Sequence, residues 1–501
     1  HNMSRYEEAS KAYRAIGVDT EKAIETLSHL PISIHCWQAD DVGGFESPDA
    51  ILSGGGIQVT GNHPGKARTI QEVQQDLEKV LQLVGGDFRL NLHASYGDFG
   101  GKKVDRDEIE PHHYDVWINW AKKHHLGIDF NGTYFSHPKA DDGYTLASKD
   151  PEIRKFWIRH AKKTREIAAY IGKELDDVCV SNTWIPDGAK DVTIDKMGYR
   201  RILKESLDEV FEKEYPQTHL KDAVETKLFG IGSEAFVVGS HEFYMNYAAR
   251  NNKMLCLDMG HFHIDEDVSD KLSSILLFDD EILLHISRPM RWDSDHVVLF
   301  NDKVKEVARE LVRSGKLGKA HIGLDFFDAS INRIGAYVTG IRSFQKAMLL
   351  ALLEPTESLR SLEKEGKGFE KLATFEALGS LPFGAVYNEF LGRNKKEDDF
   401  SKKVESLKNY NLELLNNLPN IDSDIKSIEI ENIKYQNLMD YAYYIKFKEI
   451  QKSRVEFKDT LNNDEIIPKG SKVYRWNSTG RFYHSYSLTK PTTKKNSFHK
   501  L

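Results

Sequence analysis

Short apolar runs recur along the first two thirds of the chain, and segments with helical periodicity separate them. The runs are rich in Val, Ile, Leu and aromatic residues and occupy residues 32–37, 88–96, 126–135, 176–184, 223–230, 253–262, 282–289 and 320–327. Segments between them, such as TIQEVQQDLEKVLQLV from Thr69, place apolar residues every three or four positions, as a helix with one buried face does. Strands that alternate with helices pair in parallel. Eight such units predict an α/β fold that closes into a (β/α)8 TIM barrel.

The segments outside this rhythm predict additions to the barrel. An amphipathic helix over about 5–28 precedes a barrel domain at 29–355, and a helical extension follows at 356–393. From residue 394 the composition changes, with a single alanine, Ala442, and two glycines, Gly470 and Gly480. We expect 394–501 to be an appended segment, helical at first and then irregular or in short strands. It is either an inert tail or fusion, or a module that binds an unknown partner.

Charge and composition narrow the classes of function. The formal net charge of −8 argues against a general nucleic-acid binder. The longest apolar run, MLLALL at 348–353, is too short to span a membrane, and no signal-type segment opens the sequence. Three scattered cysteines, Cys36, Cys179 and Cys256, do not form a disulfide framework. We therefore expect a cytoplasmic protein that binds neither nucleic acid nor membrane.

Titratable residues gather at and just after the ends of the apolar runs, where a barrel enzyme builds its site. They are His93, Glu225, Lys227, Asp258, His261, His285, Asp293, Asp295 and Asp325. In strand geometry Glu225 and Lys227 share one face, as do Cys256 and Asp258.

The carboxylates of this set predict bound cations. Glu225, Asp258, His285 and Asp325 come from four successive strands, and carboxylates brought together in a barrel mouth repel unless protonated or bound to cations. Two divalent ions resolve the conflict, and oxygen and imidazole ligands suit Mn²⁺, Co²⁺, Mg²⁺ or Zn²⁺. Each signal also has a plain structural alternative. A histidine on an apolar strand is often a hydrogen-bonded core residue, and the segment DSDH at 293–296 could be a helix N-cap.

Longer motifs carry a resemblance to a known family. SIHCWQADDVGGFE, WIPDGAKD, VETKLFGIGSE, LDMGHFH, SRPMRWDSDHVV and HIGLDFFDASINRI are similar to signature segments of L-rhamnose isomerase, and the resemblance covers about residues 4–393. It implies a (β/α)8 barrel, a homotetramer, and reversible conversion of L-rhamnose to L-rhamnulose with a divalent metal, commonly Mn²⁺. Two positions depart from the expected pattern: Ala39 stands where glycine is expected, and Gly132 where proline is usual.

The resemblance also implies roles for individual residues. The catalytic metal falls to His261, Asp293 and Asp295. A second, structural metal falls to Glu225, Asp258, His285 and Asp325, with Glu225 as a possible bridge between the ions. Lys227 approaches the substrate oxygens, Trp184 walls the pocket, and His93 helps to open the sugar ring.

Two further predictions concern proton transfer during the reaction and the preference for L-rhamnose. We expect Asp295 or Asp325 to accept the proton that passes between O1 and O2 of the sugar. The glycine-rich segment at 53–66 follows the first strand, and we expect its Ile57 and Val59 to enclose the C6 methyl group of a 6-deoxy sugar.

Two rival interpretations stay open at this point. The first is another metal-dependent barrel, such as a sugar isomerase or epimerase that acts on a related aldose; a phosphodiesterase would bring more histidine ligands and a phosphate clamp. The second is a barrel retained as a scaffold, with residues 394–501 binding a partner.

Overall fold

A computed structural model describes residues 3–46, 59, 61–230, 232–291 and 295–396 of the chain, and the backbone of seven short strands between 428 and 500. These strands are β11 (Ile428–Ile430), β12 (Ile433–Tyr435), β13 (Phe457–Asp459), β14 (Glu465–Ile467), β15 (Tyr474–Asn477), β16 (His484–Ser487) and β17 (Ser497–Lys500). They form two antiparallel pairs and one three-stranded sheet.

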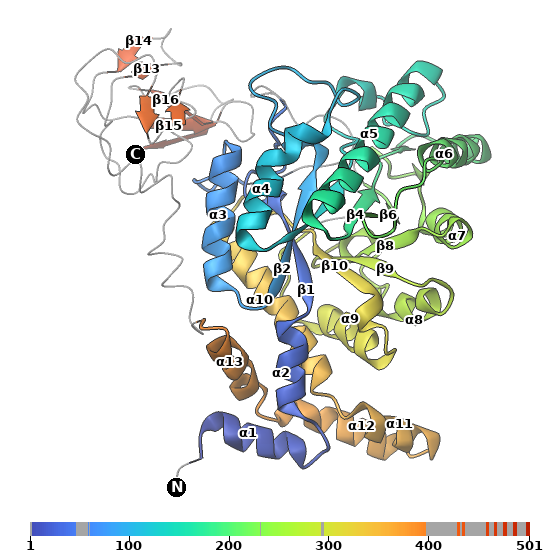
Figure 1. The fold of residues 1–501 in the computed structure, drawn as a ribbon, viewed down its shortest axis with the longest axis vertical. Helices are drawn as coiled ribbons and strands as arrows, with labels where there is room; N and C mark the ends of the chain where they lie inside the picture. The colour runs from blue at the N-terminus through green and yellow to red at the C-terminus, as the bar shows by residue number, and fades with distance from the viewer. Residues whose placement is uncertain are drawn as a thin grey trace.

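Eight parallel strands close into a barrel, as the alternating pattern predicts (Figure 1). They are β1 (Pro31–His35), β2 (Asp87–His93), β3 (Gly127–Asn131), β4 (Cys179–Thr183), β6 (Leu220–Glu225), β8 (Met254–Asp258), β9 (Ile282–Ile286) and β10 (Ala320–Leu324). Going round the barrel, their order is β1-β10-β9-β8-β6-β4-β3-β2. The register places Asp258 opposite His285. Because all eight strands are parallel, their carboxyl ends form a single rim.

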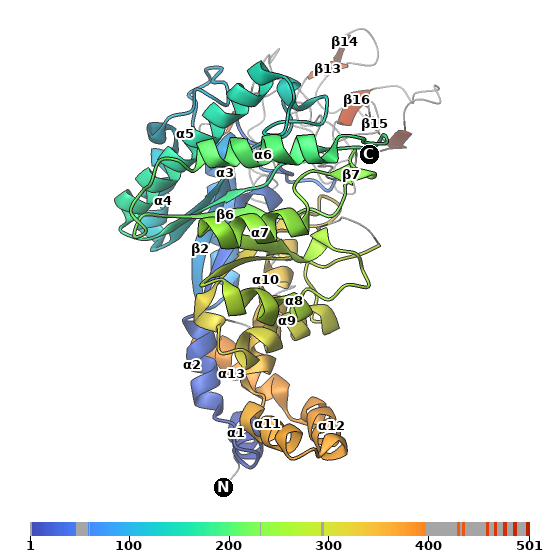
Figure 2. The same ribbon diagram turned by 90° about the vertical axis from the view of Figure 1, so that its right-hand side faces the viewer.

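Helices surround the strands on the outside (Figures 1 and 2). They are α3 (Ile70–Leu83), α4 (Asp115–His124), α5 (Pro151–Leu175), α6 (Lys196–Val210), α7 (His241–Asn251), α8 (Ser269–Phe278), α9 (Asp302–Arg313) and α10 (Arg333–Leu352). The described part of the chain also contains a short antiparallel pair, β5 (Gly188–Ala189) and β7 (Phe236–Val237), and seven 3-10 turns. The turns are η1 (Cys36–Gln38), η2 (Ala94–Tyr96), η3 (Pro111–Tyr114), η4 (Pro138–Ala140), η5 (Met259–His261), η6 (Leu317–Lys319) and η7 (Leu378–Ser380).

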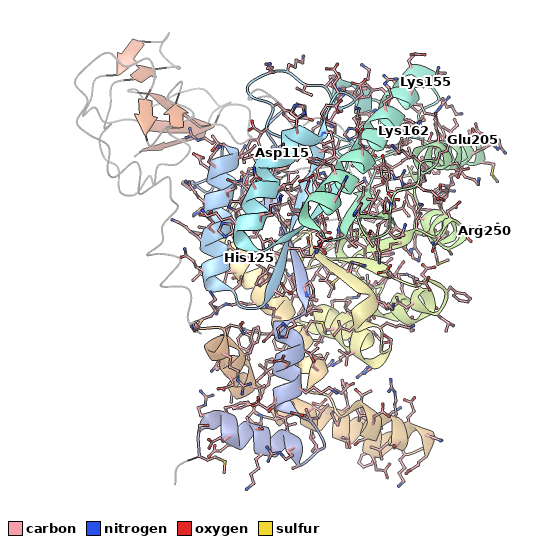
Figure 3. All side chains as sticks on the ribbon, in the orientation of Figure 1. Asp115, His125, Lys155, Lys162, Glu205 and Arg250 are labelled. Carbon is pink, nitrogen blue, oxygen red and sulfur yellow. The ribbon has the colours of Figure 1, made fainter. Side chains whose placement is uncertain are left out.

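Helix α9 shows why these segments are helical. Its buried residues are Val304, Val307, Ala308 and Leu311, the spacing of one helix face, and that face packs toward the barrel. Asn301 caps the helix by accepting a hydrogen bond from the backbone N–H of Val304, a contact worth about 1 kcal/mol. On the opposite side of such helices charged side chains project outward, for example those labelled on α5, α6 and α7 in Figure 3.

The N-terminal segment contains two helices where the apolar pattern predicts one. Helix α1 (Arg5–Arg14) ends before Gly17, whose φ of 83° lies in the left-handed region that favours glycine. The backbone N–H of Val18 then donates to the carbonyl of Tyr13, and Asp19 caps α2 (Thr20–Ser28). The break turns the chain, so that both helices contact α13 and α2 also packs against α10.

The C-terminal extension consists of α11 (Thr356–Lys364), α12 (Gly368–Ala377) and α13 (Phe383–Arg393). These helices gather with α1 and α2 at one end of the molecule (Figure 1). Arg393 pairs with Glu21 and lies over the ring of Tyr6, which joins α13 to the two N-terminal helices. No helix in the described part of the chain is long and apolar enough to cross a membrane.

Candidate metal centre and substrate pocket

Four of the predicted ligands meet at the carboxyl-terminal rim of the barrel. Glu225 and Asp258 are the last residues of β6 and β8, His285 lies near the end of β9, and Asp325 directly follows β10. One ligand atom from each lies within 4.8 Å of the others. The sequence-based expectation that these four strands bring their polar residues together agrees with this geometry.

A second group of three potential ligands lies beside the first. Asp258, His261 and Asp295 also have ligand atoms within 4.8 Å of one another. Asp258 therefore belongs to both groups, whereas the resemblance suggests Glu225 as the bridging residue. The carboxylate of Glu225 nevertheless lies between them, with Oε2 at 3.2 Å from Nδ1 of His261 and Oε1 at 3.1 Å from Nδ1 of His285. Asp293, the remaining predicted ligand, lies outside the described residues.

Nδ1 of both histidines lies near the carboxylate of Glu225, but only in His261 does a backbone carbonyl also face that nitrogen. Nδ1 of His261 lies 3.0 Å from the carbonyl oxygen of Thr226, which can only accept, so a proton on Nδ1 would make Nε2 the atom available to a metal. Nε2 faces Oδ2 of Asp258 at 3.9 Å. In His285 it is Nδ1 that faces the oxygens of Glu225, Asp258 and Asp325, at 3.1, 3.6 and 3.5 Å.

The chemistry of this donor set fits a divalent cation. Oδ2 of Asp258 is buried and has no hydrogen-bond partner among the described residues, although it points into a group of acidic and imidazole side chains. Such an atom is costly unless something compensates it. Carboxylate oxygens with imidazole nitrogens are ligands for Mn²⁺, Co²⁺, Zn²⁺ or Mg²⁺. The site would hold such an ion through Glu225, Asp258, His285 and Asp325.

The pKa shifts in the cluster also favour a bound cation. Burial, together with nearby carboxylates, raises the pKa of Asp258 to about 7. Burial also raises the pKa of Glu225, but the charges of His285 and His261 outweigh it and hold that pKa below its ordinary value. The pKa of His285 is raised well above its usual range against the effect of burial, because the carboxylates of Glu225, Asp258 and Asp325 lie beside it. Without a cation, the cluster therefore limits its negative charge by retaining protons, which a metal ion would displace.

A cysteine borders the cluster as a neutral group. Cys256 lies on the same face of β8 as Asp258, as the strand period predicts, and Sγ is 3.6 Å from Oε1 of Glu225. Burial raises the pKa of the Cys256 thiol well above its ordinary value, so it stays protonated and donates to the carboxylate.

Three side chains that hold the ligands in place were not among the sequence-predicted site residues. Asn182, from β4, donates through Nδ2 to Oε1 of Glu225 at 2.7 Å. Trp37 donates through Nε1 to Oδ1 of Asp325 at 3.1 Å, and Ser287 donates to Oδ1 of Asp258 at 3.1 Å. Their positions just at or after strand ends are a signal that sequence reasoning could have used. Their partners, up to 288 residues away in the case of Trp37, were not visible to it.

Lys227 and Trp184 form one wall of the space above the cluster. Lys227 is buried, and its Nζ lies 5.0 Å from the ring centroid of Trp184. Trp184 also lies near His261, with 6.3 Å between ring centroids. Strand β6 ends at Glu225, and the backbone N–H of Lys227 donates to the carbonyl of Gly239. Lys227 therefore lies two residues beyond the end of the strand in which the sequence pattern placed it.

His93 belongs to the same aromatic lining as Trp184, since its ring lies 5.6 Å from that of Phe135, which lies 5.9 Å from that of Trp184. It ends β2, packs edge-on against Trp37 at 4.8 Å, and has Nδ1 at 3.2 Å from the hydroxyl of Thr133. Burial lowers the pKa of His93 to about 4, so the imidazole is neutral at neutral pH. Val59, predicted to contact C6 of the sugar, is buried, whereas Ile57 lies outside the described residues.

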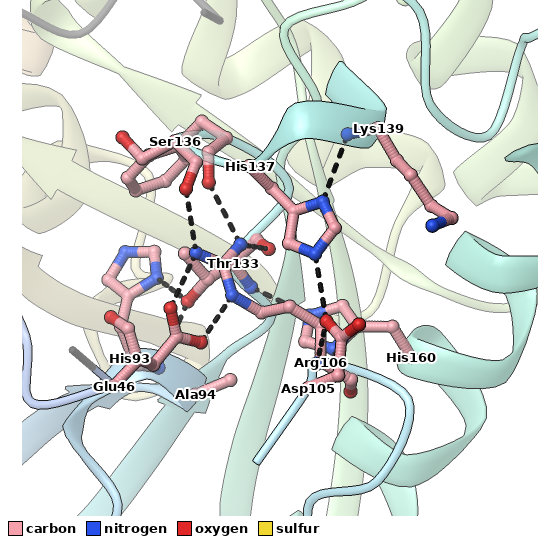
Figure 4. A network of polar contacts seen from close by, with 12 residues as sticks. Glu46, His93, Ala94, Asp105, Arg106, Thr133, Ser136, His137, Lys139 and His160 are labelled. Carbon is pink, nitrogen blue, oxygen red and sulfur yellow. Dashed lines mark hydrogen bonds and ion pairs between the residues drawn. The ribbon is translucent and has the colours of Figure 1, made fainter. Parts of the chain in front are cut away.

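A buried arginine holds the loop behind His93 (Figure 4). Arg106 donates to the carbonyl oxygens of Thr133, Phe135 and Ser136 and forms an ion pair with Glu46. This loop follows Gly132, where the family resemblance leads to an expectation of proline.

Comparison with known proteins identifies the family. The family described as L-rhamnose isomerase (RhaA) matches residues 2–417. The chain belongs to the L-rhamnose isomerase family. The match extends past residue 393, where the resemblance to the motifs ends.

Individual L-rhamnose isomerases are closely similar to the chain. The protein of Listeria monocytogenes serotype 4a (strain HCC23) is 54% identical over 386 residues, which cover 77% of this chain and 91% of that protein. The protein of Bacteroides thetaiotaomicron is 51% identical over 402 residues, covering 80% and 95%. That of Rhodopirellula baltica is 54% identical over 385 residues, covering 77% and 90%.

Solved structures are only distantly similar to the chain. The structure of an L-ribulose 3-epimerase aligns with a TM-score of 0.41 at 12% identity, covering 59% of this chain and 96% of that one. So distant a likeness says nothing about the reaction. Membership of the L-rhamnose isomerase family, an aldose–ketose isomerase family, rests on the sequence relatives.

Proposed function

We propose that this protein interconverts L-rhamnose and L-rhamnulose with the help of two divalent ions, Mn²⁺ being the expected metal and Co²⁺, Zn²⁺ or Mg²⁺ alternatives. The observation that carries the proposal is the convergence of Glu225, Asp258, His285 and Asp325 within 4.8 Å, in a chain of this family. The second ion would lie against His261, Asp293 and Asp295. A homotetramer is part of the proposal by resemblance alone, and sedimentation velocity tests it.

Aldose–ketose isomerisation moves a hydrogen between C1 and C2 of the open-chain sugar, and negative charge develops on O1 and O2. A bound divalent ion supplies Lewis-acid stabilisation of that charge. The side chains of this protein do the rest. Lys227 is a fixed cation in a buried position, and its ammonium beside O1 or O2 would stabilise the same charge without reorganisation. Trp184 covers this cation and keeps water away from it.

Proton movements fall to a neutral base and to carboxylates. His93 is uncharged because burial depresses its pKa, so it can accept the proton of the ring hydroxyl when the sugar ring opens. Asp325 is held by the indole N–H of Trp37 at 3.1 Å, which fixes the carboxylate as it exchanges a proton with the sugar oxygens. Asp295 is the alternative acceptor, next to His261.

The experiment is a ketose assay on the full chain with L-rhamnose, before and after EDTA treatment. We expect L-rhamnulose to form, activity to disappear with EDTA, and Mn²⁺ to restore it. L-mannose and L-lyxose should react more slowly, because a single apolar contact discriminates by about 1–3 kcal/mol.

Product analysis by NMR separates this proposal from its rivals. An epimerised aldose in place of a ketose would favour another barrel enzyme of this kind, and no turnover with any aldose would favour a scaffold. As a matched pair, Glu225→Gln should abolish turnover, while Glu242→Gln, an exposed residue of α7, should leave it unchanged. Equal activities in the two variants would contradict the assigned ligand.

A further inference from the structure

The barrel interior beneath the metal cluster is partly hollow, and polar side chains share its lining with apolar ones such as Val180 and Leu283. Large branched apolar side chains usually fill the interior of such barrels. Here the strands contribute Ser33, Asn91, Asn131, Asn182 and Gly323, and these residues border a cavity of about 750 Å³. Asn131 donates to the side-chain oxygen of Asn91 at 2.7 Å, so these two wall amides are joined by a hydrogen bond.

The cavity runs from the metal cluster to the face of the barrel opposite the substrate pocket. Its inner end is lined by His285 and Asn182. Its outer end is lined by the amino-terminal residues of the strands and by the end of α2, where the side chains of Glu25 and His29 are 74% and 72% exposed. Solvent therefore reaches the cavity without passing through the sugar pocket.

Two buried polar atoms at the inner end lack a hydrogen-bond partner among the described residues. They are Nε2 of His285 and Oδ1 of Asn182, in side chains of residues only 2% and 3% exposed. Because Nδ1 of His285 faces the carboxylates, its use as a ligand leaves the proton on Nε2, which becomes a donor. Nδ2 of Asn182 donates to Glu225, which leaves Oδ1 as an acceptor.

Nε2–H of His285 is thus an uncharged donor and Oδ1 of Asn182 an uncharged acceptor. A small molecule that both accepts and donates hydrogen bonds could pair with each of them. Leaving either atom unpaired would cost about 1–3 kcal/mol. We propose that this cavity is a hydration site of the metal centre, in which water accepts the Nε2–H of His285 and donates to Oδ1 of Asn182. Solvent thus takes the place that a carboxylate or backbone carbonyl usually occupies behind a metal-bound histidine. The inference rests on the proposed metal centre, since the metal fixes the tautomer of His285.

The water has a structural task. By pairing with Asn182 it keeps the amide turned so that Nδ2 points at Glu225. By pairing with His285 it fixes the ring plane and increases the electron density on Nδ1. Both effects strengthen ligands of the same ion, from the side of the barrel that the substrate does not enter.

Gly323 offers a way to remove the water and to replace it. A Cβ added to Gly323 would lie 3.4 Å from Cδ2 and 3.7 Å from Nε2 of His285, which is ordinary contact with no backbone strain. Gly323→Ala would thus put a methyl group where the water sits, while Gly323→Ser would put a hydroxyl there. Gly318→Ala serves as a control at the outer end, where an added Cβ meets no atom within 4 Å.

The experiment measures Mn²⁺ affinity of the full-length variants by calorimetry against a competing chelator. We expect Gly323→Ala to bind Mn²⁺ at least about 10-fold more weakly than wild type, as when partners behind metal ligands are lost. Gly323→Ser should regain most of that affinity, and Gly318→Ala should match wild type. An alanine variant with wild-type affinity, or a serine variant as weak as the alanine one, would overturn the inference.

A high-resolution crystal structure of the Mn²⁺-loaded wild type gives a second, independent test. Ordered water within hydrogen-bond distance of Nε2 of His285 and Oδ1 of Asn182 supports the hydration site, and a dry or side-chain-filled cavity refutes it. Wild-type protein that binds no Mn²⁺ would instead refute the proposed function, and the electron density would still decide whether water occupies the cavity.

Discussion

Replacing Asp258 by asparagine should have opposite effects on the metal-free and the metal-loaded protein. In the metal-free protein, Asp258 shares a buried cluster with the carboxylates of Glu225 and Asp325 and with His285. Asparagine keeps the side-chain oxygen that accepts from Gly260 and Ser287 and replaces Oδ2 with a neutral N–H donor. We therefore expect the variant to be more stable than wild type without metal, and to bind Mn²⁺ far more weakly.

The size of the stabilisation follows from the distances. Two unit charges 4.8 Å apart repel by about 3.5 kcal/mol at an effective dielectric constant of about 20, so the repulsion from Glu225 and Asp325 adds to about 7 kcal/mol. Attraction to a charged His285, whose Nδ1 is 3.6 Å from Oδ2 of Asp258, offsets about 5 kcal/mol of this. The variant should thus gain at least about 2 kcal/mol, before the relief of desolvation is added.

The gain should depend on pH in a definite direction. The pKa of Asp258 is about 7 in the folded protein because burial disfavours its charge, whereas an unfolded aspartate titrates near 4. Between these values the folded state binds a proton that the unfolded state does not. Metal-free wild type therefore loses stability as pH rises from about 4 to about 7, and the variant escapes this loss. The difference between the two should be full at pH 8 and vanish near pH 4.

Urea unfolding of EDTA-treated protein at pH 5 and pH 8 measures the change in stability. Titration with Mn²⁺ measures the affinity for the metal, which should fall at least about 100-fold because a ligand is lost. Asp222→Asn is the matched control. Asp222 is also buried but pairs with Arg165 at 2.9 Å, so its loss should destabilise by about 3–5 kcal/mol. If metal-free Asp258→Asn were less stable than wild type at pH 8, the account of an uncompensated cluster would be wrong.

Three further variants test the pocket and its support. Lys227→Met should lower kcat about 10²–10³-fold with metal content unchanged, because it removes a fixed cation; turnover near that of wild type in the ketose assay would contradict this role. Arg106→Met should cost about 3–5 kcal/mol in urea unfolding, since it leaves Glu46 and three carbonyls without their donor, and a loss below about 1 kcal/mol would exclude the proposed clamp. Burial holds the pKa of His160 at about 3, so the folded state binds fewer protons than the unfolded state between pH 6.5 and 3 and stability falls on acidification. The fall in unfolding free energy from pH 6.5 to 4 should be shallower in His160→Gln, and equal slopes would show that another group is responsible.

The repeating pattern of apolar residues was sufficient to predict the barrel, because each strand carries its own signal of length and burial and parallel pairing follows from the helices between strands. The same rule predicted the location of the chemistry. Glu225, Asp258 and His285 lie at strand ends, and Asp325 directly follows one, so a closed parallel barrel brings them to one rim whatever the details of packing.

Other features depended on contacts that no local pattern records. The turn at Gly17 splits a predicted helix, and the end of β6 at Glu225 removes Lys227 from the strand register. Asn182 donates to a residue 43 positions away, so its role behind Glu225 is visible only in the folded chain. The sequence determined which ligands meet, because the topology aligns strand ends. Only the tertiary structure decided that Asp258 lies in both groups of potential metal ligands and that the barrel beneath them is hollow. The reason is that the direction of a side chain and the volume it fills depend on all of its neighbours in space.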